Sequence, residues 1–464
     1  MRLQQQLVTE LNLRAQLLAE EMARWQKLAD ENKDGMGIHQ SQISVVQLLF
    51  EELDNKQQKV LGALNEAQGR VEFTRKRMDL ENELSATHGI IAIFRNILAQ
   101  RKDERYFREV LDAADLIAAD CYKPSIQLAA QWGAISEEEF RVPPLTYLNT
   151  MYSPAAFTRR HFFGAFKMPL NGYVELKLPI SVVSLPFHHT EALWTFCTIY
   201  HEVGHLLDQD LALHEGLRPS LEKEFQSPQG MPPWSHWLKE MIADTFGILL
   251  GSAGFAYTMM KLLLLPHKKV TKWDQSDRHP TPYVRIFLLG ALLRAMEEPD
   301  LAEVADRMEQ TWREWYGEPT ELAPYVEQGV KQCPAVAEIL LHQPLEKLGG
   351  HCLRDFVPTF ADDQKRIASL ATYLRLDFKR PDPRDFPVRL VPAAAQLAAW
   401  AVNDNKQAKY YPEIQERTLK YLQALRHHYP AFLHQDNFDN VSPNREAYLR
   451  GLVEKLNFST LELE

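Results

Sequence analysis

Residues 192–207 read ALWTFCTIYHEVGHLL, an apolar stretch that carries His201 and His205 four residues apart. The pattern predicts a helix, on which side chains at positions i and i+4 lie one above the other on the same face. Both imidazoles can therefore reach one metal ion. Glu202, the residue after His201, is then placed beside the remaining coordination position.

A catalytic zinc site needs a third protein ligand and one open position. The next helix that matters is predicted over residues 236–263, where Glu240 and Asp244 interrupt a strongly apolar sequence. An unpaired carboxylate is costly in such surroundings. The two acids share one helical face, so Glu240 can bind the ion while Asp244 accepts a hydrogen bond from a ligand imidazole.

The third ligand has rivals in the sequence. A helix start exposed to water would also accommodate Glu240 and Asp244 without a metal. A histidine six residues beyond His205 would be typical of metzincins, but position 211 is Leu. Less ordered sequence between the two helices offers further candidate ligands: His214, Glu215, Glu222 and Glu224.

Residues 173–184 read YVELKLPISVVS, and apolar and polar residues alternate from Val174 to Ile180. This period of two predicts a half-exposed strand. Pro179 cannot donate a hydrogen bond to a neighbouring strand, so we expect an edge strand around residues 174–184. Such an edge is suited to bind an extended peptide by strand addition.

The pairing of HExxH at residues 201–205 with ExxxD at residues 240–244 resembles the active site of gluzincin metallopeptidases. A second segment, His279-Pro-Thr-Pro-Tyr-Val-Arg285-Ile286, is similar to the HPxxxxRI segment that follows the glutamate helix in the HtpX-like branch of these peptidases. The similarity covers residues 171–290, and the chain departs from that branch by lacking its membrane spans.

The resemblance implies a zincin-like core, in which a strand edge and two helices surround one Zn²⁺. Its ligands would be His201, His205 and Glu240, with Asp244 hydrogen-bonded behind a ligand histidine.

The resemblance also implies hydrolysis of a peptide bond by a zinc-bound water that Glu202 activates as the base. His279 or Arg285 is then the candidate donor to the oxyanion, and Tyr283 is a further one.

Helical patterns precede this core. Residues 3–29 and 43–71 carry apolar stripes typical of coiled coils, and residues 33–37 form the expected turn between them. We expect a helical hairpin that packs on the rest of the chain. A coiled coil that dimerises or binds a protein partner is the alternative.

Beyond the hairpin, helical patterning continues to residue 135. Residues 142–169 show no clear period, so we expect irregular, well-packed connecting structure there. Residues 393–428 predict a further helix. The expected fold is mostly α-helical with a small β-sheet, in three parts: an N-terminal helical region (1–135), a zincin-like core (136–335) and a C-terminal helical region (336–464).

Composition excludes several classes of protein. Lys and Arg total 52 against 62 Asp and Glu, a net charge of −10, which argues against a nucleic-acid partner. The longest uncharged run, residues 245–260, is shorter than the roughly 20 residues that span a membrane. The N-terminus lacks the apolar part of a secretory signal, and the four cysteines form no CxxC pair, so we expect a cytoplasmic location.

These patterns favour a zinc-dependent endopeptidase that cleaves a specific intracellular protein. One alternative is a zinc-dependent amidase or deacylase, for which a closed pocket would be typical. The other is a non-catalytic helical interaction protein with a vestigial metal site. Glu202 argues against the latter, because a purely structural metal site has no need of a base.

Overall fold

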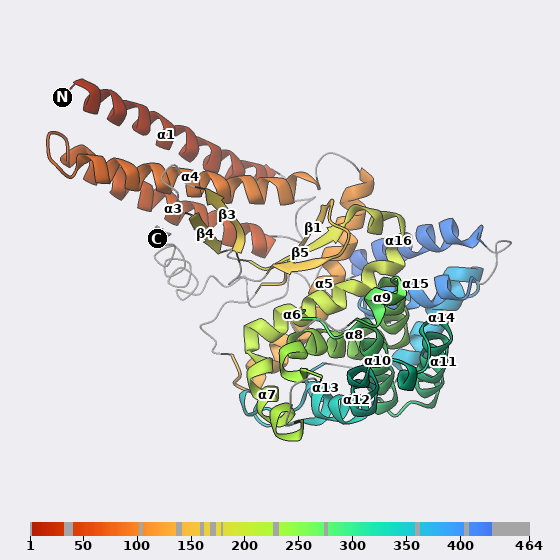
Figure 1. Cartoon of the computed structure of the whole chain (residues 1–464). Helices are drawn as coiled ribbons and strands as arrows, with labels where there is room; N and C mark the ends of the chain where they lie inside the picture. The colour runs from red at the N-terminus through yellow and green to blue at the C-terminus, as the bar shows by residue number, and fades with distance from the viewer. Residues whose placement is uncertain are drawn as a thin grey trace.

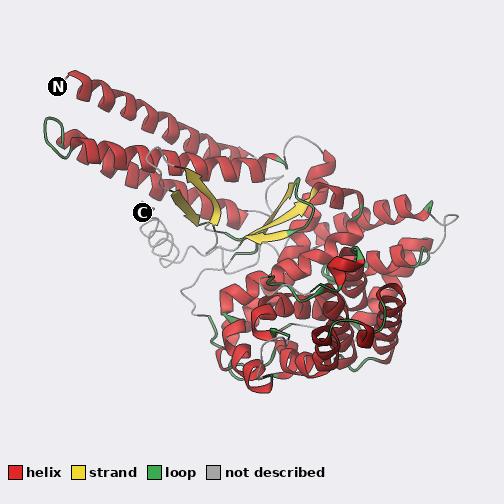
Figure 2. Ribbon diagram, viewed as in Figure 1, coloured by secondary structure: helices red, strands yellow, loops and turns green. Residues whose placement is uncertain are grey.

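Helices dominate the computed structural model and strands are few (Figure 2), so the expected mostly α-helical class is confirmed. The structure describes residues 2–31, 40–101, 105–135, 142–157, 162–167, 173–177, 180–225, 232–272, 277–357, 362–402 and 408–428.

Three long helices form a bundle that projects from the rest of the molecule (Figure 1): α1 (Arg2–Glu31), α3 (Gln40–Glu66) and α4 (Phe73–Ala99). Their apolar faces meet in a core that includes Leu11 and Leu53, and Leu145 and Val182 from the sheet region belong to the same core. The apolar stripes that predicted a coiled coil are therefore covered by helices of the same chain. The expected turn at residues 33–37 lies outside the described residues.

The helix expected over residues 43–71 ends earlier, at Glu66. Gly69 adopts a φ of +76°, a conformation that glycine reaches at little cost, and α4 begins at Phe73. Val71, which we expected on the apolar face, is 99% exposed. The apolar spacing misled because it continues in the sequence beyond the end of α3 and into the turn.

The strands form two small sheets. In the first, the order is β1-β5-β2: β1 (Leu145–Asn149) is parallel to the central strand β5 (Val182–Pro186), and β2 (Ala155–Phe157) is antiparallel to it. In the second, β3 (Phe162–Lys167) pairs with β4 (Tyr173–Lys177) in antiparallel fashion. β2 is therefore an edge of the first sheet.

Two expectations about this region are wrong. Residues 142–169 contain β1, β2 and β3 rather than irregular structure. The edge strand expected around residues 174–184 is instead two strands in different sheets, β4 and β5. Because β5 is a central strand and every residue in it is buried, alternation of polar and apolar residues could not reveal its position.

The remaining helices pack around α6 (Thr198–Leu211) and α8 (Trp234–Leu262). α8 confirms the helix expected over residues 236–263. The helix expected from residue 192 begins only at Thr198, after two 3₁₀ turns, and residues 393–428 hold two helices rather than one. The other helices are α5 (Arg105–Gln131), α7 (Leu213–Glu224), α9 (His267–Val270), α10 (Pro282–Ala295), α11 (Pro299–Tyr316), α12 (Pro324–His342), α13 (Leu353–Phe356), α14 (Asp363–Leu376), α15 (Leu390–Trp400) and α16 (Tyr410–His428).

A single large hydrophobic core joins the helices from α5 to α16. It includes Ile117 of α5, Phe246 of α8 and Tyr421 of α16, all fully buried. The C-terminal helices therefore pack in the same core as α6 and α8.

α8 is interrupted at Ser252, whose φ of 46° and ψ of −131° are not helical. Ser252 is buried, and its hydroxyl accepts a hydrogen bond from the side chain of Gln364 on α14. The part of α8 before Ser252 packs against α6, and the part after it continues to Leu262.

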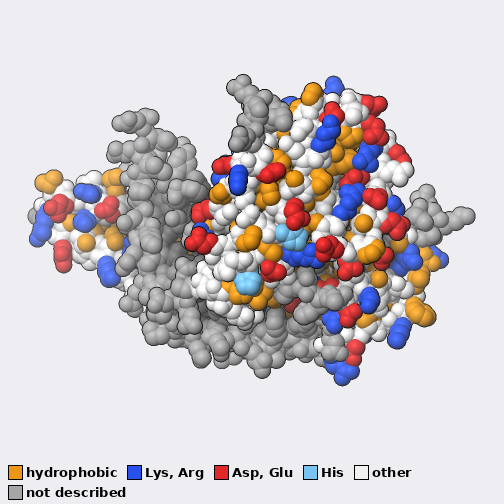
Figure 3. All heavy atoms as spheres, turned by 90° about the horizontal axis from the view of Figure 1, so that it is seen from below, with side chains coloured by type: hydrophobic (Ala, Val, Ile, Leu, Met, Phe, Trp, Pro, Cys, Tyr) orange, Lys and Arg blue, Asp and Glu red, His pale blue; other side chains and the backbone are white. Residues whose placement is uncertain are grey.

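The surface agrees with the composition. On the face of the molecule shown in Figure 3, acidic and basic side chains are mixed, and the described residues form no broad basic area there. Among those same residues, we find no helix with the length and apolar character of a membrane span.

α6 and α8 approach each other closely at Gly204. A Cβ atom added to Gly204 would lie 2.8 Å from the Cα atom of Ala243 and 3.0 Å from the Cβ atom of Phe246. We therefore expect Gly204→Ala to push the helices apart and to lower the free energy of unfolding by ~1–3 kcal/mol. Urea unfolding followed by circular dichroism measures this change.

Gly62→Ala is the matched control. Gly62 lies in α3 and has no atom within 4 Å of an added Cβ. Because alanine favours helix over glycine, this variant should gain about 0.5–1 kcal/mol. If both variants unfold alike, the close approach at Gly204 does not constrain the fold.

Candidate metal centre

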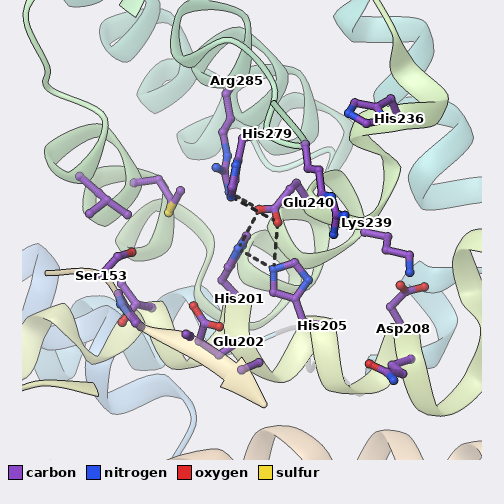
Figure 4. A pocket seen from close by; sticks show the side chains of 18 residues that line it. Ser153, His201, Glu202, His205, Asp208, His236, Lys239, Glu240, His279 and Arg285 are labelled. Atoms are coloured by element: carbon purple, nitrogen blue, oxygen red, sulfur yellow. Dashed lines mark hydrogen bonds and ion pairs between the residues drawn. The ribbon is translucent and has the colours of Figure 1, made fainter. Parts of the chain in front are cut away.

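α6 and α8 bring the three predicted metal ligands together. The Nε2 atoms of His201 and His205 lie 3.1 Å apart. Glu240 places one carboxylate oxygen 3.3 Å from Nε2 of His201 and the other 3.4 Å from Nε2 of His205 (Figure 4). All three ligand atoms lie within 4.8 Å of one another, so this partly buried group could hold a metal ion.

Asp244 and Arg285 support the ligands from behind. The Nδ1 atom of His201 lies 3.0 Å from a carboxylate oxygen of Asp244, which is fully buried. Arg285, on α10, donates two hydrogen bonds to Asp244, at 2.6 Å and 2.8 Å, and one to Glu240 at 3.5 Å. Asp244 thus fixes the ring of His201 and leaves its Nε2 free to bind an ion.

The two histidines have opposite protonation tendencies. Burial alone would lower the pKa of His201, but Asp244 and Glu240 beside it outweigh burial and raise this pKa to about 10. Burial and the neighbouring His201 lower the pKa of His205 to about 4. These surroundings therefore favour the protonated form of His201 and the neutral form of His205.

Glu240 and Asp244 favour the ionised form. Burial alone would raise the pKa values of Glu240 and Asp244. For Glu240, the neighbouring His201 and His205 hold the pKa below its usual range. For Asp244, the charge of Arg285 does so. The group thus offers an ionised carboxylate, from Glu240, and a neutral imidazole, from His205, to a cation.

Glu202 lies beside this group and is itself buried. Burial raises the pKa of Glu202 to about 7, with a further contribution from the charge of Glu240. The backbone N–H of Ala156, in edge strand β2, donates a hydrogen bond to its carboxylate. A carboxylate with a pKa near neutrality can both accept and release a proton at physiological pH.

These side chains line a cavity of about 390 Å³. Ser153 and the start of β2 form one wall, and α6 and α8 form the others (Figure 4). Met259 and Leu262, from the part of α8 after Ser252, add apolar surface. We call His201, His205 and Glu240 the metal group. The cavity therefore combines this metal group, the Glu202 carboxylate of raised pKa and the edge of strand β2.

The structure separates the other predicted site residues. His279 lines the cavity, with its Nε2 3.5 Å from Glu240 and its Nδ1 2.8 Å from Asp277. The guanidinium of Arg285 is directed at Asp244 and Glu240. Tyr283 is fully buried and outside the cavity lining, and its hydroxyl donates a hydrogen bond to the carbonyl of Gly317 at 2.7 Å.

The rival third ligands do not join the group. His214 lies 2.9 Å from Asp208, and Glu215 pairs with Lys347 at 2.9 Å. Glu222 lies 3.8 Å from Arg218 on the surface of α7. Glu224 lies at the exposed end of the same helix.

Sequence reasoning missed several residues of the cavity wall. His236 and Lys239 precede Glu240 by four residues and one residue, so helical periodicity could have placed His236 on the face of Glu240. Arg278 precedes His279 and gives no signal of its own. Ser153 and Ala156 belong to a turn and a strand of three residues, too short for a recognisable pattern.

No protein-family model matches the chain, and comparisons with curated proteins and with solved structures find no similar protein. The function therefore has to be argued from the geometry and chemistry of this cavity.

The ligand assignment predicts the metal content. We expect about one transition-metal ion per purified chain. His205→Ala and Glu240→Ala each remove a ligand, so their metal affinity should fall by more than the ~10–100-fold typical when a residue hydrogen-bonded to a ligand is replaced. Elemental analysis after dialysis measures it. Glu222→Ala, at a rival ligand, is the control and should keep the ion. Retention by Glu240→Ala would identify a different third ligand.

Metal binding should depend on pH, because an ion must displace the proton from His201. The pKa of that histidine is about 10 without metal, so the apparent affinity should rise by ~10-fold per pH unit between pH 6 and 9. Competition with a chromogenic chelator at several pH values measures this slope. Asp244→Asn removes the main charge that stabilises the proton on His201. In this variant the plot of apparent affinity against pH should therefore become flatter at high pH. A parent slope of zero would contradict the assignment.

Proposed function

We propose that the protein is a zinc-dependent peptidase of the gluzincin type. The observation that carries this proposal is the convergence of His201, His205 and Glu240 in one cavity with Glu202, a buried carboxylate whose pKa is raised to about 7. A structural metal site would have no use for such a base.

The donor set suits zinc. Two imidazole nitrogens and one carboxylate leave the fourth position open, as in catalytic zinc sites, where bonds of ~2.0–2.2 Å separate tetrahedral ligand atoms by about 3.3–3.6 Å. The separations here, 3.1, 3.3 and 3.4 Å, are close to that range. The Asp244 carboxylate behind His201 is the partner that zinc-bound histidines usually have.

A bound zinc ion would supply a Lewis acid and would lower the pKa of water towards neutrality. Glu202 accepts the proton released in the cavity and passes it to the leaving nitrogen, while the N–H of Ala156 holds its carboxylate in place. His279 is exposed beside Glu240 and can donate to the developing oxyanion. Arg285 acts by positioning Asp244 and Glu240.

Strand β2 supports a peptide as the substrate. It pairs with β5 on one side and is the edge of its sheet among the described residues, and it borders the cavity. An extended peptide added to this edge would lie across the metal group. In this proposal β2 binds the peptide, whereas the sequence analysis expected residues 174–184 to do so.

A small substrate is the second candidate. The cavity of about 390 Å³ is within the usual size of small-molecule sites, so an amidase or deacylase would use the same residues. Cleavage of peptides longer than the cavity separates the two functions.

We infer a cytoplasmic location from the cysteines. All four are free, and Cys121, Cys197 and Cys333 are buried, as expected in a reducing compartment. A protein partner at the N-terminal bundle has candidate contacts in the exposed Leu13 and Leu17 of α1.

Replacing the base provides the decisive test. Glu202→Gln keeps the shape of the side chain but cannot accept the proton, so hydrolysis should fall by ~10²–10⁴-fold while the zinc content stays unchanged. Cleavage of a peptide mixture, followed by mass spectrometry, measures the rate. Glu222→Gln is an exposed control on α7. Unchanged hydrolysis in Glu202→Gln would exclude the proposed mechanism.

A further inference from the structure

The cavity extends beyond His205 to an end that the proposed chemistry does not use. Figure 4 shows Asp208, His236 and Lys239 on this side, opposite Ser153. His236 and Lys239 come from the first turns of α8, and Arg278, from the segment before α10, also lines the cavity. The lining of the cavity therefore contains cationic side chains from both α8 and the segment before α10.

The acids that line the cavity are already engaged by the protein. Glu240 faces both histidines and Arg285. Asp208 accepts a hydrogen bond from the backbone of His214 at 2.7 Å and lies 2.9 Å from its ring. Glu202 accepts one from the backbone of Ala156. Each of these carboxylates therefore already has a partner within the protein.

Two cations of the lining are not engaged. Lys239 and Arg278 are exposed, and neither makes a hydrogen bond or an ion pair with any residue that the structure describes. Lys239 makes a small electrostatic contribution to lowering the pKa of Glu215, but the carboxylate of Glu215 is paired with Lys347 at 2.9 Å. Arg285, the third cation of the lining, is held by Asp244.

Both free cations are adjacent in sequence to residues of the metal group. Lys239 precedes the ligand Glu240, and Arg278 precedes His279, whose Nε2 lies 3.5 Å from Glu240. They thus reach the cavity from two different elements. A ligand that occupies the cavity meets positive charge close to the position where a bond would be cleaved.

We propose that Lys239 and Arg278 bind a carboxylate of the substrate close to the scissile bond. This inference rests on the proposed peptidase function and adds a preference to it. The carboxylate has two sources, an Asp or Glu side chain within the peptide or the α-carboxylate at the end of the peptide. The first source gives an endopeptidase that prefers acidic sequences, and the second gives a carboxypeptidase.

Binding is measured separately from turnover by using the zinc-loaded full-length Glu202→Gln chain. Fluorescent peptides carry Glu, Gln or Lys at each position in turn, and each is made with a free or an amidated C-terminus. Fluorescence anisotropy should show binding stronger by ~10-fold or more for peptides with a carboxylate at one position or at the free end. The parent chain should cleave the same peptides faster.

Charge reversal assigns the preference to the two residues. Lys239→Glu combined with Arg278→Glu should remove the preference for a carboxylate and favour the Lys peptides. Lys223→Glu, on the exposed end of α7 and outside the cavity, is the matched control and should keep the parent preference. Zinc content and circular dichroism verify that each variant is folded.

The outcomes separate this inference from the proposed function. Equal binding of Glu, Gln and Lys peptides, or a preference unchanged by the double reversal, would overturn the inference while cleavage by the parent leaves the peptidase function standing. If the zinc-loaded chain neither binds nor cleaves any peptide, both are overturned. A preference for the free C-terminus over an internal Glu would select the carboxypeptidase form of the inference.

Discussion

The carboxylate of Asp244 is fully buried and contacts side chains from two other helices. Asp244 belongs to α8, and it meets His201 of α6 and Arg285 of α10. An unpaired charge in this position would be strongly destabilising, because burial removes its hydration and nothing else replaces it. The three helices must therefore come together for any one of these groups to be tolerated in the core. The same contacts turn His201 towards Glu240, so the packing of the body and the geometry of the metal group depend on one interaction.

Opposite charges balance one another at the candidate ligands. Glu240 and Asp244 carry two negative charges, while Arg285 and the protonated His201 supply two positive ones. These four charges cancel. A divalent ion bound by His201, His205 and Glu240 would replace the proton of His201.

The sequence revealed the parts of the site that follow helical periodicity. His201, His205, Glu240 and Asp244 were predicted because spacing of four residues places side chains on one face, and the structure brings them together. The same rule explains the exception at Tyr283. It lies two residues before Arg285, about 200° around the helix, so when Arg285 faces the metal group Tyr283 faces Gly317. The strands were poorly predicted, because β2 has three residues and β5 is buried on both faces. The wall at Lys239 and Arg278 depends on tertiary packing, which no local pattern contains.

The break in α8 at Ser252 connects two walls of the cavity that differ in chemistry. The part before it carries Glu240 and Asp244, and the part after it carries Met259 and Leu262. The backbone angles of Ser252, twelve positions beyond Glu240 in the sequence, therefore set the inclination of the apolar wall relative to the metal group. The breadth of the substrate that fits can change at Ser252 while the chemistry at the ligands stays the same.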